Sequence, residues 1–276
     1  MRIRLVSLSV LLIMLGPALL HAVPQPTYYL ALGDSLAIGV QPSLSGDVAT
    51  NQGYADDLYS VFRTRFRGLA LAKLGCSGET TTSMIHGGIC TYAEGSQLSA
   101  AINFLLTHRV AFVTLDIGGN DIDHCVSLAG IDSACVTDAL STVAVDLPQI
   151  LAELRSAAGP DTLIVGMNYY DPFLAAWRLG PSGQLLANAS LLATNAFNGL
   201  LEKVYRDPAF DIPVADVADA YQINNPLPIF NLPLNVFIEL TWTWIGAPAP
   251  FGPDIHPNTV GYVVIAGAFA RKIETP

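Results

Sequence analysis

Four short stretches of this 276-residue chain carry residue types that can support nucleophilic catalysis. In chain order they are Gly33-Asp34-Ser35-Leu36, Gly75-Cys76-Ser77-Gly78-Glu79-Thr80, Gly118-Gly119-Asn120-Asp121 and Asp254-Ile255-His256-Pro257. A serine hydroxyl becomes an effective nucleophile when a histidine takes its proton, and N–H donors can hold the negative charge that builds on the attacked carbonyl oxygen. Gly-Asp-Ser by itself is common in turns, where the serine would only cap the following segment. The ordered set of four is far more specific, and it favours catalysis at Ser35 with His256 as the base.

Together the four stretches resemble the blocks of the GDSL lipase/esterase family, also called the SGNH hydrolases, over about residues 30–272. The resemblance implies a carboxylic ester hydrolase that works through an acyl-enzyme, with Ser35 as the nucleophile and His256 as the general base. It also implies an oxyanion hole made by the backbone N–H groups of Ser35 and Gly78 and the side-chain amide of Asn120. Such a site needs no cofactor and no metal ion.

The last stretch departs from the usual spacing of that family, in which an aspartate stands three residues before the histidine. Pro253 occupies that position here, and Asp254 stands only two residues before His256. Two arrangements remain open: the Asp254 carboxylate reaches the imidazole, or a backbone carbonyl such as that of Pro253 orients it and leaves a Ser–His dyad. We therefore expect Asp254→Ala to lose much less activity than alanine at Ser35 or His256.

The elements that must position these residues alternate along the chain. Strand-like apolar runs cover residues 28–32, 69–74, 110–117, 162–167 and 212–217. Helix-like segments cover residues 54–66, 98–107, 136–157, 185–205 and 259–272. Strands separated by helices of this length predict an α/β fold: a three-layer α/β/α sandwich with a central, mostly parallel five-stranded sheet, as in the flavodoxin-like SGNH hydrolases.

Three of the candidate residues follow directly after predicted strands. Ser35, Gly78 and Asn120 come just past the first, second and third strand. Parallel sheets bind their ligands beyond the carboxyl ends of the strands, so these residues are expected to meet at one edge of the sheet.

The N-terminus has the features of a secretory signal peptide, with a basic start, an apolar middle and a small residue at Ala22. We expect residues 1–22 to be removed and residues 23–276 to form a single domain that is secreted or periplasmic; the alternative is a membrane anchor. The chain has 13 basic and 23 acidic residues, and removal of two arginines with the signal leaves 11 against 23, or −12. This charge argues against nucleic acid as a partner. We expect a monomer without stable membrane insertion after cleavage, whose partner is a small-molecule or lipid ester.

Four cysteines in an exported chain predict two disulfides. The cysteines are Cys76, Cys90, Cys125 and Cys135. Three connectivities are possible, and nearness in sequence favours Cys76–Cys90 and Cys125–Cys135, which would brace the two loops of the oxyanion hole. The alternative is a metal site formed by Cys90, Cys125, His86 and His124, which no regular metal-ligand spacing supports.

An aromatic-rich stretch, residues 223–251, lies just before His256 and carries the candidate substrate-binding residues Phe230, Phe237, Trp242 and Trp244. We expect some of these side chains to line an acyl-chain groove or lid, although core packing would account for others.

Other functions fit the sequence less well. An α/β-hydrolase is disfavoured because Ala37 replaces the last glycine of its Gly-x-Ser-x-Gly turn and the serine follows the first strand. A carbohydrate O-acetylesterase of the same superfamily would use the same Ser35 and His256. A non-catalytic exported lipid- or carbohydrate-binding protein would not need all four stretches intact.

Overall fold

Five strands form one parallel sheet in the computed structural model of the protein, which describes residues 26–127 and 129–274. The strands are, in their order across the sheet, β4 (Leu69–Lys73), β1 (Thr27–Gly33), β5 (Arg109–Asp116), β8 (Leu163–Met167) and β9 (Val214–Ala215). All four pairings are parallel; Leu30, for example, lies between Ala72 and Val113. The predicted fold class is therefore confirmed. The chain leaves β1 towards β4 on one side and returns to β5 on the other, so the switch point of the sheet lies between β1 and β5.

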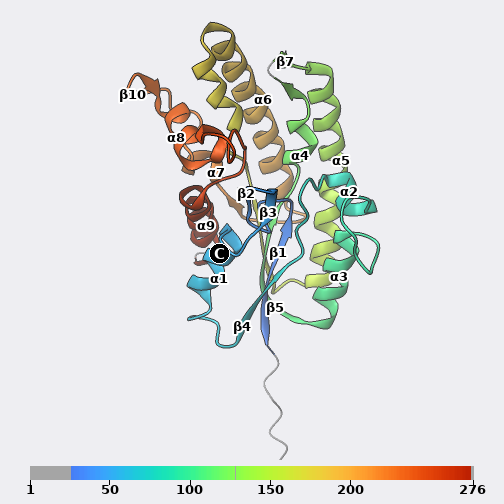
Figure 1. The fold of residues 1–276 in the computed structure, drawn as a ribbon. Coiled ribbons are helices and arrows are strands. Elements are labelled where there is room, and N and C mark those ends of the chain that lie inside the picture. Colours follow the sequence, from blue (N-terminus) through green and yellow to red (C-terminus); the bar gives the residue numbers. More distant parts are fainter. Residues whose placement is uncertain (1–25, 128, 275–276) are drawn as a thin grey trace, which may run out of the picture.

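Helices cover both faces of this sheet and complete the three layers (Figure 1). The helices of these layers are α1 (Tyr54–Phe62), α3 (Gln97–Thr107), α5 (Ser133–Ala158), α6 (Pro181–Tyr205) and α9 (Thr259–Glu274). α1 packs against α9 on one face, where the Tyr54 and Phe269 rings stack with centroids 4.9 Å apart. α3 and α5 pack together on the other face, with α6 beside α5. The predicted signal peptide lies outside the described residues.

α5 is the one helix of the described chain that is long and apolar enough to cross a membrane, with 26 residues and a mean hydropathy of 1.2. In the fold it packs against α2, α3, α4 and α6. Its apolar side, which includes Val143, Leu147 and Leu154, is buried in the core.

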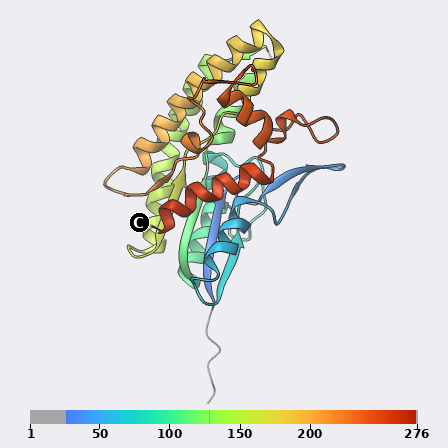
Figure 2. The same ribbon diagram turned by 90° about the vertical axis from the view of Figure 1, so that its left-hand side faces the viewer.

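Several short elements lie between the long ones and were not predicted, because they are too short to show a hydrophobic period. The short helices are α2 (Thr81–His86), α4 (Gly119–Asp123), α7 (Val217–Ala220), α8 (Leu234–Trp242) and the 3₁₀ helices η1 (Pro172–Leu179) and η2 (Trp244–Gly246). The hairpins are β2–β3 (Val40–Ser43 and Gly46–Ala49), β6–β7 (Val126–Ser127 and Gly130–Ile131) and β10–β11 (Pro228–Ile229 and Leu232–Pro233). The blue β2–β3 hairpin projects from the body of the molecule (Figure 2). The β2–β3 hairpin, α4 and η1 follow β1, β5 and β8, so they begin beyond the carboxyl ends of those strands.

Candidate active site

Ser35 lies in the turn that follows β1. The turn begins at Gly33, whose φ is +130° and where an added Cβ would lie 1.8 Å from the Asp116 carbonyl oxygen, so only glycine fits. The Asp34 N–H donates to the same carbonyl oxygen at 3.1 Å, and the Asp34 carboxylate accepts the Leu36 N–H at 2.9 Å. These contacts hold Ser35, which is 7% exposed, at the carboxyl end of the strand.

A cavity of about 180 Å³ opens at this edge of the sheet. Ser35, Gly78, Asn120 and His256 all line it, so residues from all four sequence stretches meet at one pocket. The pocket lies at the switch point between β1 and β5, where parallel sheets bind ligands. Asp254 reaches it through its contact with His256.

Three residues that line this pocket have N–H groups available to a ligand. The Asn120 amide at the start of α4 donates one N–H to the Glu79 carbonyl oxygen at 3.0 Å, which orients the side chain and leaves its second N–H for a ligand. The backbone N–H groups of Ser35 and Gly78 have no hydrogen-bond partner within the described part of the chain. Gly78 has φ +81°, and no atom lies within 4 Å of an added Cβ, so its backbone conformation rather than space demands glycine.

Gln97, at the start of α3, ties two of the catalytic loops together. Its side chain accepts the Gly33 N–H at 2.7 Å and donates to the Gly33 carbonyl oxygen at 2.9 Å. The same amide nitrogen donates to the buried Glu79 carboxylate at 2.9 Å, next to Gly78. No motif in the sequence marks Gln97, because its role depends on contacts 64 and 18 residues away.

Asp121 makes a similar tie between the second and third stretches. Its carboxylate accepts the backbone N–H and the hydroxyl of Thr81 at 2.9 and 2.7 Å. The Gly78 loop is therefore held against α4, which carries Asn120.

Asp254 contacts the imidazole of His256 in this structure. The Asp254 Oδ1 atom lies 2.8 Å from the ring Nδ1 and also accepts the His256 backbone N–H at 2.8 Å. A tight turn thus lets a carboxylate two residues before the histidine reach its ring. Burial by itself would lower the pKa of His256, but the hydrogen bond and charge of Asp254, together with Asp47 and Asp34, raise it above its ordinary value.

Two further acidic residues near the site were missed by the sequence reasoning. Asp47, in β3, places Oδ2 4.0 Å from His256 Nδ1. Asp123 lines the pocket, and burial, together with the charges of Asp34 and Asp171, raises its pKa to about 7. Asp123 follows Asn120 by three residues in α4, and this spacing, which puts both on one helix face, is the sequence signal that identifies it. Nothing in the sequence around Asp47 connects it with His256.

The aromatic candidates of residues 223–251 lie elsewhere. Phe230 is 78% exposed and contacts Phe237, whereas Trp242 packs on Tyr221. Trp244 donates its indole N–H to Gln41 at 3.3 Å, and none of the four side chains lines the catalytic pocket.

A second, larger cavity of about 670 Å³ adjoins the catalytic pocket. Phe173 and Ile255 line both cavities and form the wall between them. Its other apolar lining residues include Ala175, Ala176, Leu179, Leu186, Leu240 and Ile245. The 223–251 stretch therefore contributes aliphatic side chains, rather than the predicted aromatic ones, to the space beside His256.

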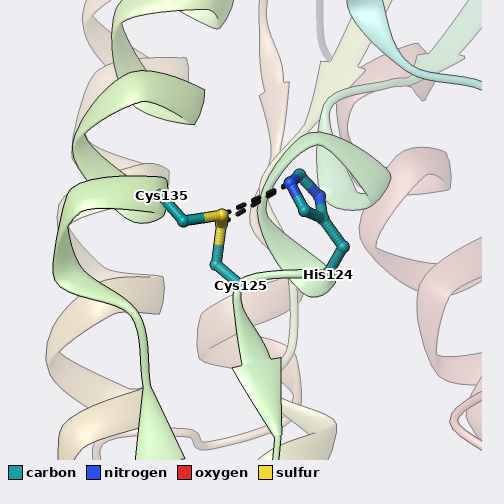
Figure 3. Close-up of side chains that lie close together, drawn as sticks. All are labelled: His124, Cys125 and Cys135. Carbon is teal, nitrogen blue, oxygen red and sulfur yellow. Dashed lines mark hydrogen bonds between the residues drawn. A yellow bond between two sulfur atoms is a disulfide. The ribbon is translucent and has the colours of Figure 1, made fainter.

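Both predicted disulfides are present, Cys76–Cys90 and Cys125–Cys135. His124 lies beside the second one, with Nε2 3.3 Å from the Cys135 sulfur (Figure 3). Cys90 and Cys125 belong to different disulfides, so their sulfurs are not available together as thiolate ligands.

The profile of the GDSL-like lipase/acylhydrolase family matches residues 31–264 of the chain. No curated protein matches the sequence.

Several solved structures share the fold. They include a lipase from a goat rumen metagenome, which is 18% identical with a TM-score of 0.54 over 89% of this chain and 96% of that one. An extracellular lipase from Streptomyces rimosus is 19% identical, with a TM-score of 0.57 over 89% of this chain and 99% of that one. A carbohydrate acetylesterase from Sinorhizobium meliloti is 13% identical, with a TM-score of 0.53 over 90% of this chain and 98% of that one.

The family match covers most of the chain, and the similar structures share its parallel sheet and flanking helices. The protein therefore belongs to the GDSL-like lipase/acylhydrolase family and is a serine ester hydrolase.

Proposed function

We propose that the protein is an exported carboxylic ester hydrolase that works through an acyl-enzyme on Ser35, with His256 as general base and Asp254 as the residue that orients it. The observation that carries this proposal is the 2.8 Å contact between Asp254 and the His256 ring at the pocket that Ser35 also lines. Export rests on the signal-like pattern of residues 1–22, and the extracellular Streptomyces rimosus lipase of similar fold is consistent with it.

Acylation begins when the Ser35 oxygen attacks the ester carbonyl and its proton passes to Nε2 of His256. The Nδ1–H of the imidazolium stays hydrogen-bonded to Asp254, which keeps Nε2 directed at the reacting oxygens. The same proton then goes to the departing alcohol. Water repeats the sequence on the acyl-enzyme and releases the acid.

The tetrahedral intermediate carries its negative charge on the former carbonyl oxygen. The backbone N–H groups of Ser35 and Gly78 and the free N–H of Asn120 are the proposed donors to this oxygen. They are held in place before substrate binds, by Gln97 and by the Glu79 carbonyl, so little reorganisation is needed.

The apolar cavity beyond Phe173 and Ile255 is the proposed site for the acyl chain. It adjoins the pocket of Ser35, and its lining is mostly aliphatic. A chain-length series of p-nitrophenyl esters tests this assignment. We expect octanoate esters to be hydrolysed at least as efficiently as acetate esters, and a sharp preference for acetate would contradict it.

A carbohydrate O-acetylesterase is the second candidate function. It is favoured by the small volume of the pocket around Ser35, about 180 Å³, and by the fold shared with the Sinorhizobium meliloti acetylesterase. Release of acetate from acetylated xylan, together with poor turnover of octanoate esters, would select this alternative.

The decisive experiment combines the ester panel with two variants. Ser35→Ala and His256→Ala are each expected to reduce kcat by about 10³-fold or more. An organophosphate should label the wild type at Ser35 and not label Ser35→Ala. Unlabelled wild type without esterase activity would instead favour a non-catalytic binding protein.

A further inference from the structure

The β2–β3 hairpin lies close to the segment that carries His256. Its base is held to the body by the Tyr262 hydroxyl of α9, which donates to the Val40 carbonyl oxygen of β2 at 2.7 Å. Trp244, in the segment that precedes His256, donates to Gln41 of β2 at 3.3 Å. The second strand of the hairpin, β3, therefore lies next to His256.

Asp47 is the residue of this hairpin that reaches the imidazole. Its Oδ2 atom lies 4.0 Å from His256 Nδ1, the same nitrogen that Asp254 contacts at 2.8 Å. One ligand atom from each of the three residues lies within 4.8 Å of the other two. The Asp47 side chain is 48% exposed, whereas that of Asp254 is 14% exposed. His256 Nδ1 thus has the buried carboxylate of Asp254 in contact and the more exposed carboxylate of Asp47 slightly farther away.

The charges in this cluster depend on one another. Partial burial and the charge of Asp254 raise the pKa of Asp47, and the charge of His256 opposes that rise. Asp47 in turn helps to raise the pKa of His256.

The other titratable groups facing His256 come from different elements. They are Asp34 after β1, Asp123 in α4 and the phenol of Tyr170, whose hydroxyl donates to the Ile255 carbonyl oxygen. Asp34 and Asp123 line the pocket, whereas Asp47 and Asp254 lie next to Nδ1 of His256.

This inference rests on the proposed function, in which His256 is the general base. We propose that Asp47 is a second acidic positioning residue for His256. Its carboxylate stabilises the imidazolium that forms when Ser35 loses its proton, and it accepts the Nδ1–H when Asp254 is absent. The proton from Ser35 resides on Nε2 until the alcohol leaves, and the Nδ1 proton never leaves the ring. Asp47 therefore touches no reacting atom.

The test measures kcat/KM against pH for a p-nitrophenyl ester in the wild type, Asp47→Asn, Asp254→Asn and the double variant. Asp47→Asn is expected to lower kcat/KM by about two- to threefold and to move the acid limb to lower pH, because a negative charge near the imidazolium is lost. The shift should shrink at about 1 M ionic strength, because the Asp47 carboxylate is exposed to solvent. In the double variant, kcat/KM should fall at least about tenfold more than the product of the two single reductions. The reason is that Asp47 can take the place of Asp254 in Asp254→Asn, whereas neither carboxylate remains in the double variant.

Asp161→Asn is the matched control for net charge, because Asp161 is exposed just before β8, at the opposite end of the strands. It should leave the acid limb in place. Asp47→Glu should restore the wild-type profile, and the thermal unfolding temperature of Asp47→Asn should equal that of the wild type.

An unchanged acid limb in Asp47→Asn together with multiplicative losses in the double variant would overturn the inference. An equal shift in Asp161→Asn would overturn it as well. Wild-type activity in His256→Ala would instead refute the proposed function itself, so the two failures are distinguishable.

Discussion

Around the catalytic pocket, the charged side chains are predominantly acidic. Asp34 and Asp123 line it with His256, and no lysine or arginine of the described residues does so. Asp254 and Asp47 stand behind the imidazole. A negative environment favours the imidazolium, which is the form of His256 in the proposed acylation step. It also makes the resting histidine harder to deprotonate.

We therefore expect the acid limb of kcat/KM to have its midpoint above about 6.5, the ordinary pKa of histidine. The midpoint lies on the high side of this value because His256 accepts a proton only when it is neutral, and its pKa is raised in the folded protein. Activity should rise as pH increases through that raised pKa. A p-nitrophenyl ester assay at constant ionic strength measures this profile, and a midpoint below about 6 would contradict it.

The glycine in the second stretch provides a second residue-scale prediction. Gly78→Ala is expected to lower kcat about tenfold or more, because alanine at φ +81° strains the loop that presents the N–H.

Gly68→Ala is the matched control, since Gly68 has φ +75°, has no atom within 4 Å of an added Cβ, and lies just before β4 outside the pocket. Both variants should lose a similar free energy of unfolding, about 1 kcal/mol. Equal kcat values in the two variants would mean that the Gly78 loop does not bind the oxyanion.

At the scale of elements, the site depends on loops that are joined to one another. Gln97 joins the end of β1 to Glu79, and Asp121 joins α4 to Thr81. Each disulfide closes a short segment next to a loop of the proposed oxyanion hole, and Cys76 lies two residues before Gly78. The segments that carry Ser35 and Gly78 lie outside the regular helices and strands, so side-chain hydrogen bonds hold them where backbone ladders do not.

Removal of the first disulfide in a Cys76→Ala/Cys90→Ala variant should reduce the free energy of unfolding by about 3 kcal/mol, the loop-entropy value for a closed loop of this size. Chemical denaturation measures this loss. kcat should fall more than KM rises, because the displaced N–H of Gly78 acts mainly in the transition state.

The Cys125–Cys135 disulfide closes a shorter loop, with a sequence separation of 10 residues against 14. Its removal in a Cys125→Ala/Cys135→Ala variant should therefore cost slightly less stability. A loss below about 1 kcal/mol in the first variant would show that the loop is held by its hydrogen bonds alone.

Over the whole molecule, burial raises the pKa of several carboxyl groups. They include Asp34, Asp116, Asp123, Asp171 and Glu239. Glu239 is fully buried, and neither of its carboxyl oxygens has a hydrogen-bond partner in the described chain. Such groups favour the folded state when protonated. Their stabilisation is present below the unfolded-state pKa of about 4 and is lost as pH rises through the folded-state value, which is about 7 for Asp123 and Asp171.

The thermal unfolding temperature should therefore fall as pH rises from about 5 to about 8. The raised pKa of His256 acts in the same direction, and the lowered pKa of Asp254 opposes it only at acid pH. Calorimetric scans across this range test the prediction. Glu239→Gln should flatten the dependence, whereas Asp161→Asn should not. A stability that increases over the whole range would contradict this interpretation.

Much of the fold follows from local sequence. β1, β4, β5 and β8 lie within two residues of their predicted bounds, because their apolar runs are bounded by polar or glycine residues. β9 is shorter than predicted, Val214–Ala215 against residues 212–217, because only two of its residues pair with β8. The hairpins and short helices were missed, since their order comes from contacts with other elements.

By itself, the sequence indicated the family, a mostly parallel sheet, the favoured disulfide pairing and the four stretches that line one pocket. These features depend on residue order and local hydrophobic pattern, which a single chain displays directly. Only the tertiary structure decided that Asp254 contacts the imidazole, that Gln97 braces two loops, that Asp47 reaches His256 from a separate hairpin and that an aliphatic cavity lies beyond Ile255. Those features depend on distances between groups far apart along the chain, or on the geometry of a single turn, and residue spacing does not encode either.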